Sequence, residues 1–303
     1  MIIEDVGMFD YSKGFLEYLN EQKSMSPNTV TAYSRDVLEF SKVLLEKSKK
    51  TLKEASNTDV VSYLLKLKTD GKSSATVNRK TASLRMFYNY LMELSYIDVN
   101  PTTNIKSPKV AKKELEYLTI EEVEKLLDLP DDSTKGLRDR AILEVLYATG
   151  IRVSELIEAN VNDVNLRMGF ITCTGEFGKA RIIPMGRLAK AAMEEYILEA
   201  RNRFVRAEAT DNNALFVNYM GRRMTRQGLW KMLKEYANQA GIDNKITPQT
   251  LRNSFAVHMV QNGADLKTLQ ELLGHEDITA TQAYLRVTQN KIKDVYDKTH
   301  PRA

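Results

Sequence analysis

Most of this chain repeats apolar side chains at the spacing of an amphipathic helix, and one short stretch breaks that repeat. Residues 11–23, the segment opened by Pro27 and the segment after Ser74 all show the helical spacing. Between Asn165 and Pro184 the character changes to two short β-like runs joined by a glycine-containing turn. The pattern therefore predicts a mainly α protein with one small antiparallel sheet.

A polar segment over residues 100–115 divides the helical pattern into two parts. It contains Pro101, Pro108 and several lysines, which is typical of a linker between domains. A chain of 303 residues is long enough for two domains. We expect a four-helix domain over residues 1–108 and a second, helical domain with the small sheet over residues 109–303.

Composition restricts the class of protein only loosely. The hydrophobic fraction of 43% allows proper cores, and a net charge of +4 is compatible with nucleic acid without requiring it. The lone cysteine, Cys173, excludes an internal disulfide, fits a reducing cytosol and lies in an apolar run typical of a buried strand. No apolar run of about 18 residues exists, and the amino terminus is acidic where a signal peptide is basic, so we expect a cytoplasmic chain without a membrane span.

Basic and hydroxyl side chains gather near the start of the helix that follows Ser73. The candidates for contact with DNA are Lys72, Ser74, Thr76, Arg79 and Lys80. Such a helix start is a suitable seat for phosphate, because its backbone N–H groups and cations point at the anion. A solvated helix face explains the same charges equally well.

In the second domain, Thr119 and Glu122 form a capping box before a helix, and another helix runs from about residue 137 to Thr149. Gly150 ends that helix, so Arg152 points into a site from a rigid base. Strands are expected at 170–173 and 181–183. Later helices are expected at 187–208, 225–240, 249–262, 265–273 and 279–285, and Trp230 is expected in the core.

The segment from Thr247 to Tyr284 carries side chains suited to a phosphodiester. Arg252 offers a planar fork of donors, His275 can donate a hydrogen bond, and Tyr284 is a possible nucleophile. Taken singly, each has an ordinary structural explanation as a salt-bridge arginine, a helix-end histidine or a packed tyrosine. Their order, together with Arg152 far upstream, favours the catalytic interpretation.

Four motifs in this order resemble the tyrosine recombinase (phage integrase) family. They are ATGIRVSEL, LRNSFAVHMVQNGADLKTLQELLGH, TQAY and the closing YDKTHPRA. Within the family, the chain is most similar to the Xer-type site-specific recombinases, and the resemblance covers nearly its whole length. The amino-terminal helices resemble the SAM-like core-binding domain, which clamps one side of the DNA duplex in that family.

The resemblance implies that Tyr284 attacks a DNA phosphate and forms a 3′-phosphotyrosyl bond. Arg152 and Arg252 would clamp the non-bridging oxygens, and His275 would donate to the same phosphate. No metal, ATP or other cofactor is implied. The implied partners are a double-stranded recombination site, a homo- or hetero-tetramer with a related recombinase and an accessory activator. Chromosome or plasmid dimer resolution is the implied role.

Three positions depart from the family pattern. Gln249 stands where the family usually has a histidine, and Glu176 stands where it usually has the lysine that protonates the leaving oxygen. Lys179, three residues later, is a candidate for that role, or else is a second, non-catalytic lysine of the turn. Asn253 replaces a common histidine, which we expect to affect packing more than chemistry.

These departures leave several hypotheses open. The chain is a working recombinase with a rearranged hairpin, a slow one that depends on a partner, or a DNA-binding relative that no longer cuts. A mobile-element integrase is a further alternative. The tail after Tyr284 is either a tether to a neighbouring subunit or a terminal helix of its own domain.

Overall fold

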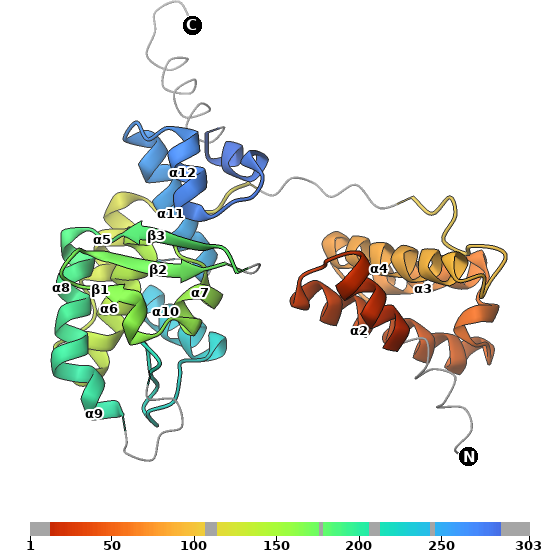
Figure 1. Ribbon diagram of the computed structural model, residues 1–303, viewed down its shortest axis with the longest axis horizontal. Coiled ribbons are helices and arrows are strands. Elements are labelled where there is room, and N and C mark those ends of the chain that lie inside the picture. Colours follow the sequence, from red (N-terminus) through yellow and green to blue (C-terminus); the bar gives the residue numbers. More distant parts are fainter. Residues whose placement is uncertain (1–12, 107–113, 176–177, 206–212, 243–245, 286–303) are drawn as a thin grey trace, which may run out of the picture. The chain divides into compact units, whose positions relative to one another are not determined.

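The computed structural model contains two compact units, Met1–Lys113 and Glu114–Ala303 (Figure 1). Each unit has its own buried core. It describes residues 13–106, 114–175, 178–205, 213–242 and 246–285. The carboxyl-terminal tail beyond residue 285 and Glu176 lie outside these residues, so the hypotheses about them stay predictions.

The first unit is built from helices, as the apolar spacing predicts. Residues 13–17 are α-helical and continue into the π-helical turn η1 (Tyr18–Gln22). There follow α2 (Pro27–Ser48), the 3-10 turn η2 (Leu52–Glu54), α3 (Asn57–Thr69) and α4 (Ser74–Glu93). The serine before each of α2, α3 and α4 caps it by accepting a backbone N–H three residues on. The expected four-helix domain is confirmed.

Aromatic side chains fill much of the core of this unit. The ring of Phe15 packs edge-on against Phe87 at 5.2 Å between centroids, and the ring of Tyr18 lies 5.0 Å from that of Tyr90. All four side chains are buried. Because they come from both ends of the unit, this contact joins the first helix to α4.

The second unit carries the small sheet. Its helices before the sheet are α5 (Ile120–Leu127), α6 (Thr134–Thr149), α7 (Val153–Glu158) and the 3-10 turn η3 (Val161–Asp163). Strands β1 (Val164–Asn165), β2 (Phe170–Thr174) and β3 (Ala180–Pro184) pair antiparallel in that order, with Ile171 opposite Ile183. The expected hairpin is confirmed, and β1 adds a short third strand.

Helices return after the sheet. They are α8 (Arg187–Glu195), the π-helical η4 (Tyr196–Arg201), α9 (Asn202–Phe204), α10 (Arg226–Ala240), α11 (Pro248–Gln261) and α12 (Leu266–Leu273), followed by helical residues 278–285. The helix expected over 187–208 is thus divided into three pieces, the last of which ends at Phe204.

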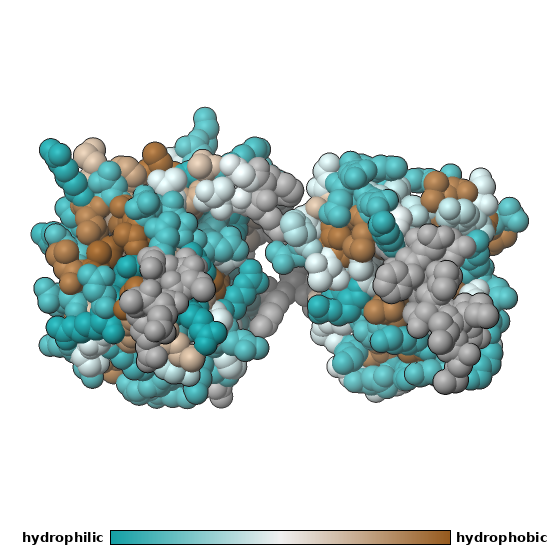
Figure 2. Space-filling model, turned by 60° about the horizontal axis from the view of Figure 1, so that its bottom comes forward, coloured by the Kyte–Doolittle hydropathy of each residue, from teal (hydrophilic) through white to brown (hydrophobic). Residues whose placement is uncertain are grey.

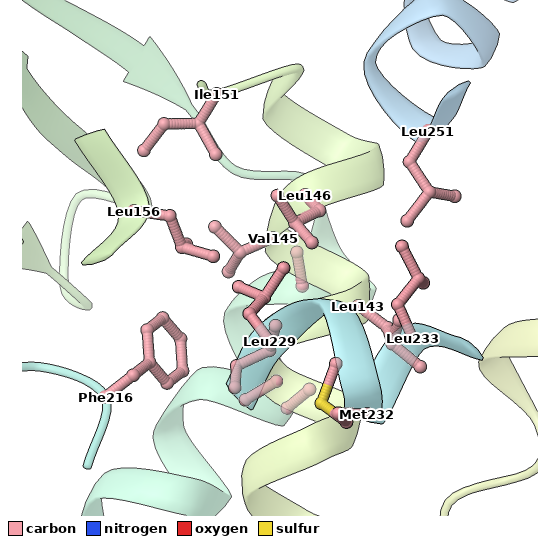
Figure 3. Close-up of a cluster of buried hydrophobic side chains, with 14 of the residues drawn as sticks. Leu143, Val145, Leu146, Ile151, Leu156, Phe216, Leu229, Met232, Leu233 and Leu251 are labelled. Atoms are coloured by element: carbon pink, nitrogen blue, oxygen red, sulfur yellow. The ribbon is translucent and has the colours of Figure 1, made fainter. Parts of the chain in front are cut away.

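Helix α6 is the centre of this unit and is buried around most of its circumference. Figure 3 shows Leu143, Val145 and Leu146 of α6 among apolar side chains of α10 and α11, including Leu233 and Leu251. All five side chains are at most 1% exposed. A helix held this firmly gives its carboxyl end, and the residues that follow, a fixed position.

The expectation that Trp230 lies in the core is wrong. Its side chain is 46% exposed, and the Lys234 ammonium lies 4.3 Å from the centre of the ring. The apolar face of α10 is formed by Leu229, Met232 and Leu233, and Trp230 projects beside that face. Figure 2 shows separate brown apolar patches on a surface that is mainly hydrophilic. No helix of the described residues is long and apolar enough to cross a membrane.

Candidate active site

The carboxyl end of α6 sets the position of Arg152. Gly150 ends the helix in the left-handed region with φ of 56°. A Cβ at this residue would lie 2.4 Å from Cδ1 of Phe255, so only glycine fits the turn without displacing the packing. Two residues later, Arg152 is the N-cap of α7, and its backbone N–H donates to Glu155 Oε2 at 2.8 Å.

The guanidinium of Arg152 is held on two sides. Nη1 donates to Glu155 Oε1 at 2.9 Å, and Nη2 donates to the Gly274 carbonyl at 2.6 Å. The side chain remains 37% exposed. Arg152 therefore lies against the turn between α12 and His275 while keeping access to solvent.

Glu155 is shared between two arginines. Besides Arg152, it accepts two hydrogen bonds from Arg181 of β3, whose Nε donates to the Leu272 carbonyl at 2.8 Å. Burial alone would raise the pKa of Glu155, but hydrogen bonds from Arg181 and the Arg152 N–H hold that pKa below its usual value. The carboxylate is therefore ionised and fixes both guanidinium groups.

Sequence reasoning missed Glu155 and Arg181, although signals for both exist. Glu155 lies at the third position of a helix that begins at Arg152, where a carboxylate caps the backbone. Arg181 lies two residues before the buried Ile183 on β3, so it shares the inward face of the strand. A charged side chain on an inward face requires a partner.

Arg252 comes from α11, whose amino terminus is capped by Thr247. The residue is 3% exposed, and its guanidinium donates to the carbonyls of Gly150 and Leu273, the latter at 2.7 Å. Burial, followed by the charge of Arg152, lowers the pKa of Arg252 to about 10. The group is still a cation at neutral pH, and carbonyl oxygens rather than a carboxylate hold it.

His275 follows the left-handed Gly274 that ends α12. Its Nε2 lies 3.1 Å from Nη2 of Arg252, and its Nδ1 lies 2.9 Å from the hydroxyl of Thr281. Because a guanidinium only donates, we assign Nε2 as the acceptor and the proton to Nδ1. Burial and the charges of Arg252 and Arg152 lower the pKa of His275 to about 4, so the imidazole is neutral.

Tyr284 lies beside this histidine. The two rings are nearly parallel, with centroids 6.3 Å apart and an interplanar angle of 12°. The tyrosine is 4% exposed, and its hydroxyl donates to Asn253 Oδ1 at 3.4 Å. Burial raises the pKa of Tyr284, and the positive charges of Arg252 and Arg152 oppose that rise. The phenol is therefore protonated at neutral pH.

The structure thus brings together Arg152, Arg252, His275 and Tyr284, as the sequence predicts. Two guanidinium cations beside a buried phenol can stabilise the charge that develops on a phosphodiester under attack. Among the described residues, no group of three or more histidine, cysteine, aspartate or glutamate side chains is arranged to hold a metal ion.

Lys179 is not brought into this group. It is exposed in the turn between β2 and β3, where its carbonyl accepts the Gly175 N–H at 2.9 Å. Within the part of the chain that the structure describes, its ammonium makes no hydrogen bond or ion pair. Gln249 lies on the first turn of α11, three residues before Arg252, and its Nε2 donates to Asn253 Oδ1 at 2.9 Å.

The predicted DNA contacts of the first unit lie at the start of α4. Ser73 caps the helix, the hydroxyl of Thr76 lies 2.9 Å from that of Ser73, and Lys72 and Ser74 are exposed. Arg79 is exposed over 41% of its side chain and pairs with Asp36.

The prediction for Lys80 requires correction. This residue is 4% exposed, and its ammonium bonds Asp36 at 3.1 Å and Glu39 at 2.8 Å. Buried charges in proteins are retained when they are paired, and this pair of carboxylates comes from α2. Lys80 therefore joins α4 to α2 inside the unit, and a phosphate cannot reach it in this arrangement.

Comparison with known proteins identifies the family of this chain. Residues 116–291 match the phage integrase family, and residues 13–94 match the phage integrase N-terminal SAM-like domain. Tyrosine recombinase XerD of Oceanobacillus iheyensis is 43% identical over 298 residues, which cover 98% of this chain and 100% of that protein. Tyrosine recombinase XerC of Roseiflexus castenholzii is 38% identical, with 98% and 95% covered.

Solved structures share the fold. The crystal structure of XerA recombinase matches with a TM-score of 0.54 and 27% identity, covering 98% of this chain and 100% of that one. XerH recombinase in a post-cleavage complex with difH substrate matches with a TM-score of 0.73 and 23% identity, covering 88% and 78%. The mainly helical fold with a SAM-like domain is therefore confirmed. The chain belongs to the phage integrase family, and it is a tyrosine recombinase of the Xer type, an enzyme that breaks and rejoins DNA.

Proposed function

We propose that this enzyme resolves chromosome or plasmid dimers by cutting and rejoining DNA at a specific site, with Tyr284 as the nucleophile. The observation that carries the proposal is the convergence of Arg152, Arg252 and His275 on the buried ring of Tyr284. The names of the relatives, XerD and XerC, support the same function.

In the proposed step, the phenol oxygen of Tyr284 attacks the phosphorus of a DNA phosphodiester. A tyrosine O–P bond forms as the P–O5′ bond breaks; the phenol loses its proton, and the departing 5′-oxygen gains one. The product is a 3′-phosphotyrosyl ester and a free 5′-hydroxyl. A 5′-hydroxyl from the partner strand reverses the step, so the ester conserves the bond energy and no ATP is required.

Arg152 and Arg252 are proposed to hold the two non-bridging oxygens. Each guanidinium has five N–H donors, and the hydrogen bonds to Glu155 and to backbone carbonyls use only some of them. A phosphate can therefore bind without dismantling the contacts that orient the pair. Such preorganised donors contribute about 3 kcal/mol each to the transition state in comparable sites.

His275 is proposed to donate to the same phosphate from Nε2. In the arrangement described, that nitrogen accepts from Arg252, and the ring is neutral. The negative charge of a bound phosphodiester favours the imidazolium, because an anion within a few ångströms raises the pKa of a base. Protonation on Nε2 would change this nitrogen from an acceptor into a donor.

The leaving 5′-oxygen must gain a proton as the P–O5′ bond breaks. Lys179 is the proposed acid, because it is an exposed side chain in the turn where the family usually places its lysine. Gln249 can donate to the phosphate but cannot move a proton at neutral pH. Because the usual proton-transfer residues are changed at Gln249 and in the turn of Lys179, DNA binding without cleavage is the second candidate function.

The first domain, residues 1–108, is proposed to clamp one side of the duplex through Lys72, Ser74, Thr76 and Arg79. The second, residues 109–303, is proposed to carry the chemistry. The complexes of XerH recombinase with difH substrate support a double-stranded recombination site as the ligand. A tetramer with itself or a related recombinase, an accessory activator and a cytoplasmic location complete the proposal.

The test is covalent trapping on a nicked duplex that carries a recombination site. Wild-type protein is expected to yield a denaturant-resistant adduct, and Tyr284→Phe is expected to yield none. Retarded DNA without an adduct, after candidate partner proteins are added, would establish the binding-only alternative. A mobile-element integrase would instead form its adduct on DNA that carries the ends of the element, and not on a chromosomal site.

A further inference from the structure

Asn253 contacts the hydroxyl of the proposed nucleophile, Tyr284. The sequence predicts that Asn253 affects packing, and this contact adds a second effect. The residue follows Arg252 on α11 and is 6% exposed. Its Oδ1 accepts a hydrogen bond from the hydroxyl of Tyr284 at 3.4 Å. Tyr284 lies 31 residues later in the chain, so tertiary packing creates this contact.

The orientation of the Asn253 amide is determined by its other partner. Nδ2 donates to the backbone carbonyl of Glu116 at 2.9 Å. Because that carbonyl can only accept, the nitrogen must face it and the oxygen must face Tyr284. The next residue, Ser254, accepts the N–H of Leu118 at 2.8 Å, so two neighbouring side chains of α11 bind the same segment.

A second donor meets the same oxygen. Nε2 of Gln249, one helical turn earlier, donates to Asn253 Oδ1 at 2.9 Å. An amide oxygen has two lone pairs and can accept from both Gln249 and Tyr284. Two hydrogen bonds therefore connect the exposed Gln249, through Asn253, to the buried phenol.

We infer that Asn253 is a positioning residue for Tyr284: its fixed side-chain carbonyl holds the phenol proton and thereby directs a lone pair of the phenol oxygen toward the phosphate. An amide oxygen is not a base near neutral pH, so Asn253 orients the hydroxyl without taking its proton. Orientation of a nucleophile contributes to rate because only near-attack geometries react. The inference rests on the proposed role of Tyr284 as the nucleophile.

The test measures adduct formation on the nicked substrate at saturating DNA, with DNA affinity and melting temperature measured in parallel. Asn253→Ala is expected to slow adduct formation roughly ten- to a hundredfold while leaving DNA affinity within about twofold. Asn253→Ser, whose shorter side chain cannot reach the phenol from the same backbone, is expected to show the same loss if the alanine variant does not fold.

Ser254→Ala is the matched control. It removes the neighbouring anchor to the 116–118 segment but no contact with Tyr284, so it is expected to lower the melting temperature and leave the rate at saturating DNA unchanged. Asn253→His, which retains an acceptor nitrogen when neutral at pH 8, is expected to restore most of the rate.

The outcomes separate the inference from the proposed function. A wild-type adduct with an unchanged rate in folded Asn253→Ala or Asn253→Ser would overturn the inference alone. An equal loss in Ser254→Ala would also overturn it, because the effect would then be one of anchoring. No adduct from wild type would overturn the proposed function and the inference with it.

Discussion

Arg181 binds Glu155 through two parallel hydrogen bonds, Nη1 to Oε1 at 2.6 Å and Nη2 to Oε2 at 2.8 Å. The same carboxylate also receives Nη1 and the backbone N–H of Arg152. Arg181 of β3 thus helps to fix the orientation of Arg152, a proposed catalytic residue, because both bind the Glu155 carboxylate. The link explains why the sheet matters to a site that is otherwise built on helices.

Arg181→Ala should therefore damage both stability and cutting. Removing one partner of a buried pair leaves a desolvated charge and costs about 3 kcal/mol. We expect a similar loss of unfolding free energy and slower adduct formation, since Glu155 would be free to draw Arg152 away from the phosphate. Chemical denaturation and covalent trapping measure the two effects. Arg187→Ala, at an exposed position of α8, should change the unfolding free energy by no more than about 0.5 kcal/mol and leave the rate of adduct formation unchanged.

Gly274→Ala should be more harmful than Gly263→Ala, although both glycines have positive φ, 62° and 91°. A Cβ at residue 274 would lie 3.0 to 3.1 Å from the guanidinium of Arg181, whereas at residue 263 it would meet nothing within 4 Å. Backbone strain costs each variant about 1 kcal/mol or more. Only Gly274→Ala should also slow adduct formation, and equal rates in the two variants would contradict the proposed importance of the Arg181 contact.

The two clamp arginines should respond differently to substitution. Arg152→Ala is expected to lower the rate of adduct formation by about 10²- to 10³-fold with a small change in melting temperature, because this side chain is partly exposed. Arg252→Ala should lower the rate as much and also destabilise the fold, since it leaves the carbonyls of Gly150 and Leu273 without their donor. Equal melting temperatures would contradict this distinction.

His275 should make stability depend on pH in a defined window. Its pKa is about 4 in the folded protein and near 6.5 when unperturbed, so the unfolded state binds the proton first as pH falls. The contribution of neutral His275 to the free energy of unfolding is therefore fully present above about pH 6.5 and is lost as the pH falls toward 4. Allowing for its partial exposure, we expect about 1 kcal/mol. His275→Gln should lose less stability than wild type between pH 7.5 and 4.5 in parallel denaturation curves.

Lys72 and Lys80 offer a test of the corrected DNA-binding set. Lys72→Ala should weaken DNA binding and reduce the slope of log affinity against log salt by roughly one, as expected when one phosphate contact is lost. Lys80→Met should keep that slope but lower stability, because it removes the buried cation that pairs with Glu39 and leaves Asp36 with Arg79 alone. A reduced salt slope for Lys80→Met in fluorescence anisotropy titrations would restore Lys80 to the interface.

Local patterns in the sequence were sufficient for the elements themselves. The helix starts at Pro27, Asn57, Ser74 and Ile120 follow capping residues that interact within three positions of the chain. The β2–β3 hairpin likewise depends on neighbouring residues. The order of the motifs also indicates Arg152, Arg252, His275 and Tyr284, because each motif carries its residue at a recognisable spacing.

Only the tertiary structure decided which faces are buried and which distant side chains meet. Lys80 and Trp230 were misplaced by sequence reasoning because an isolated helix does not reveal which of its flanks a neighbour covers. The contacts of Glu155 with Arg181 and of Asn253 with Tyr284 join residues 26 and 31 positions apart. Such contacts depend on how α6, α11 and the sheet pack around a common core, and no local spacing encodes that packing.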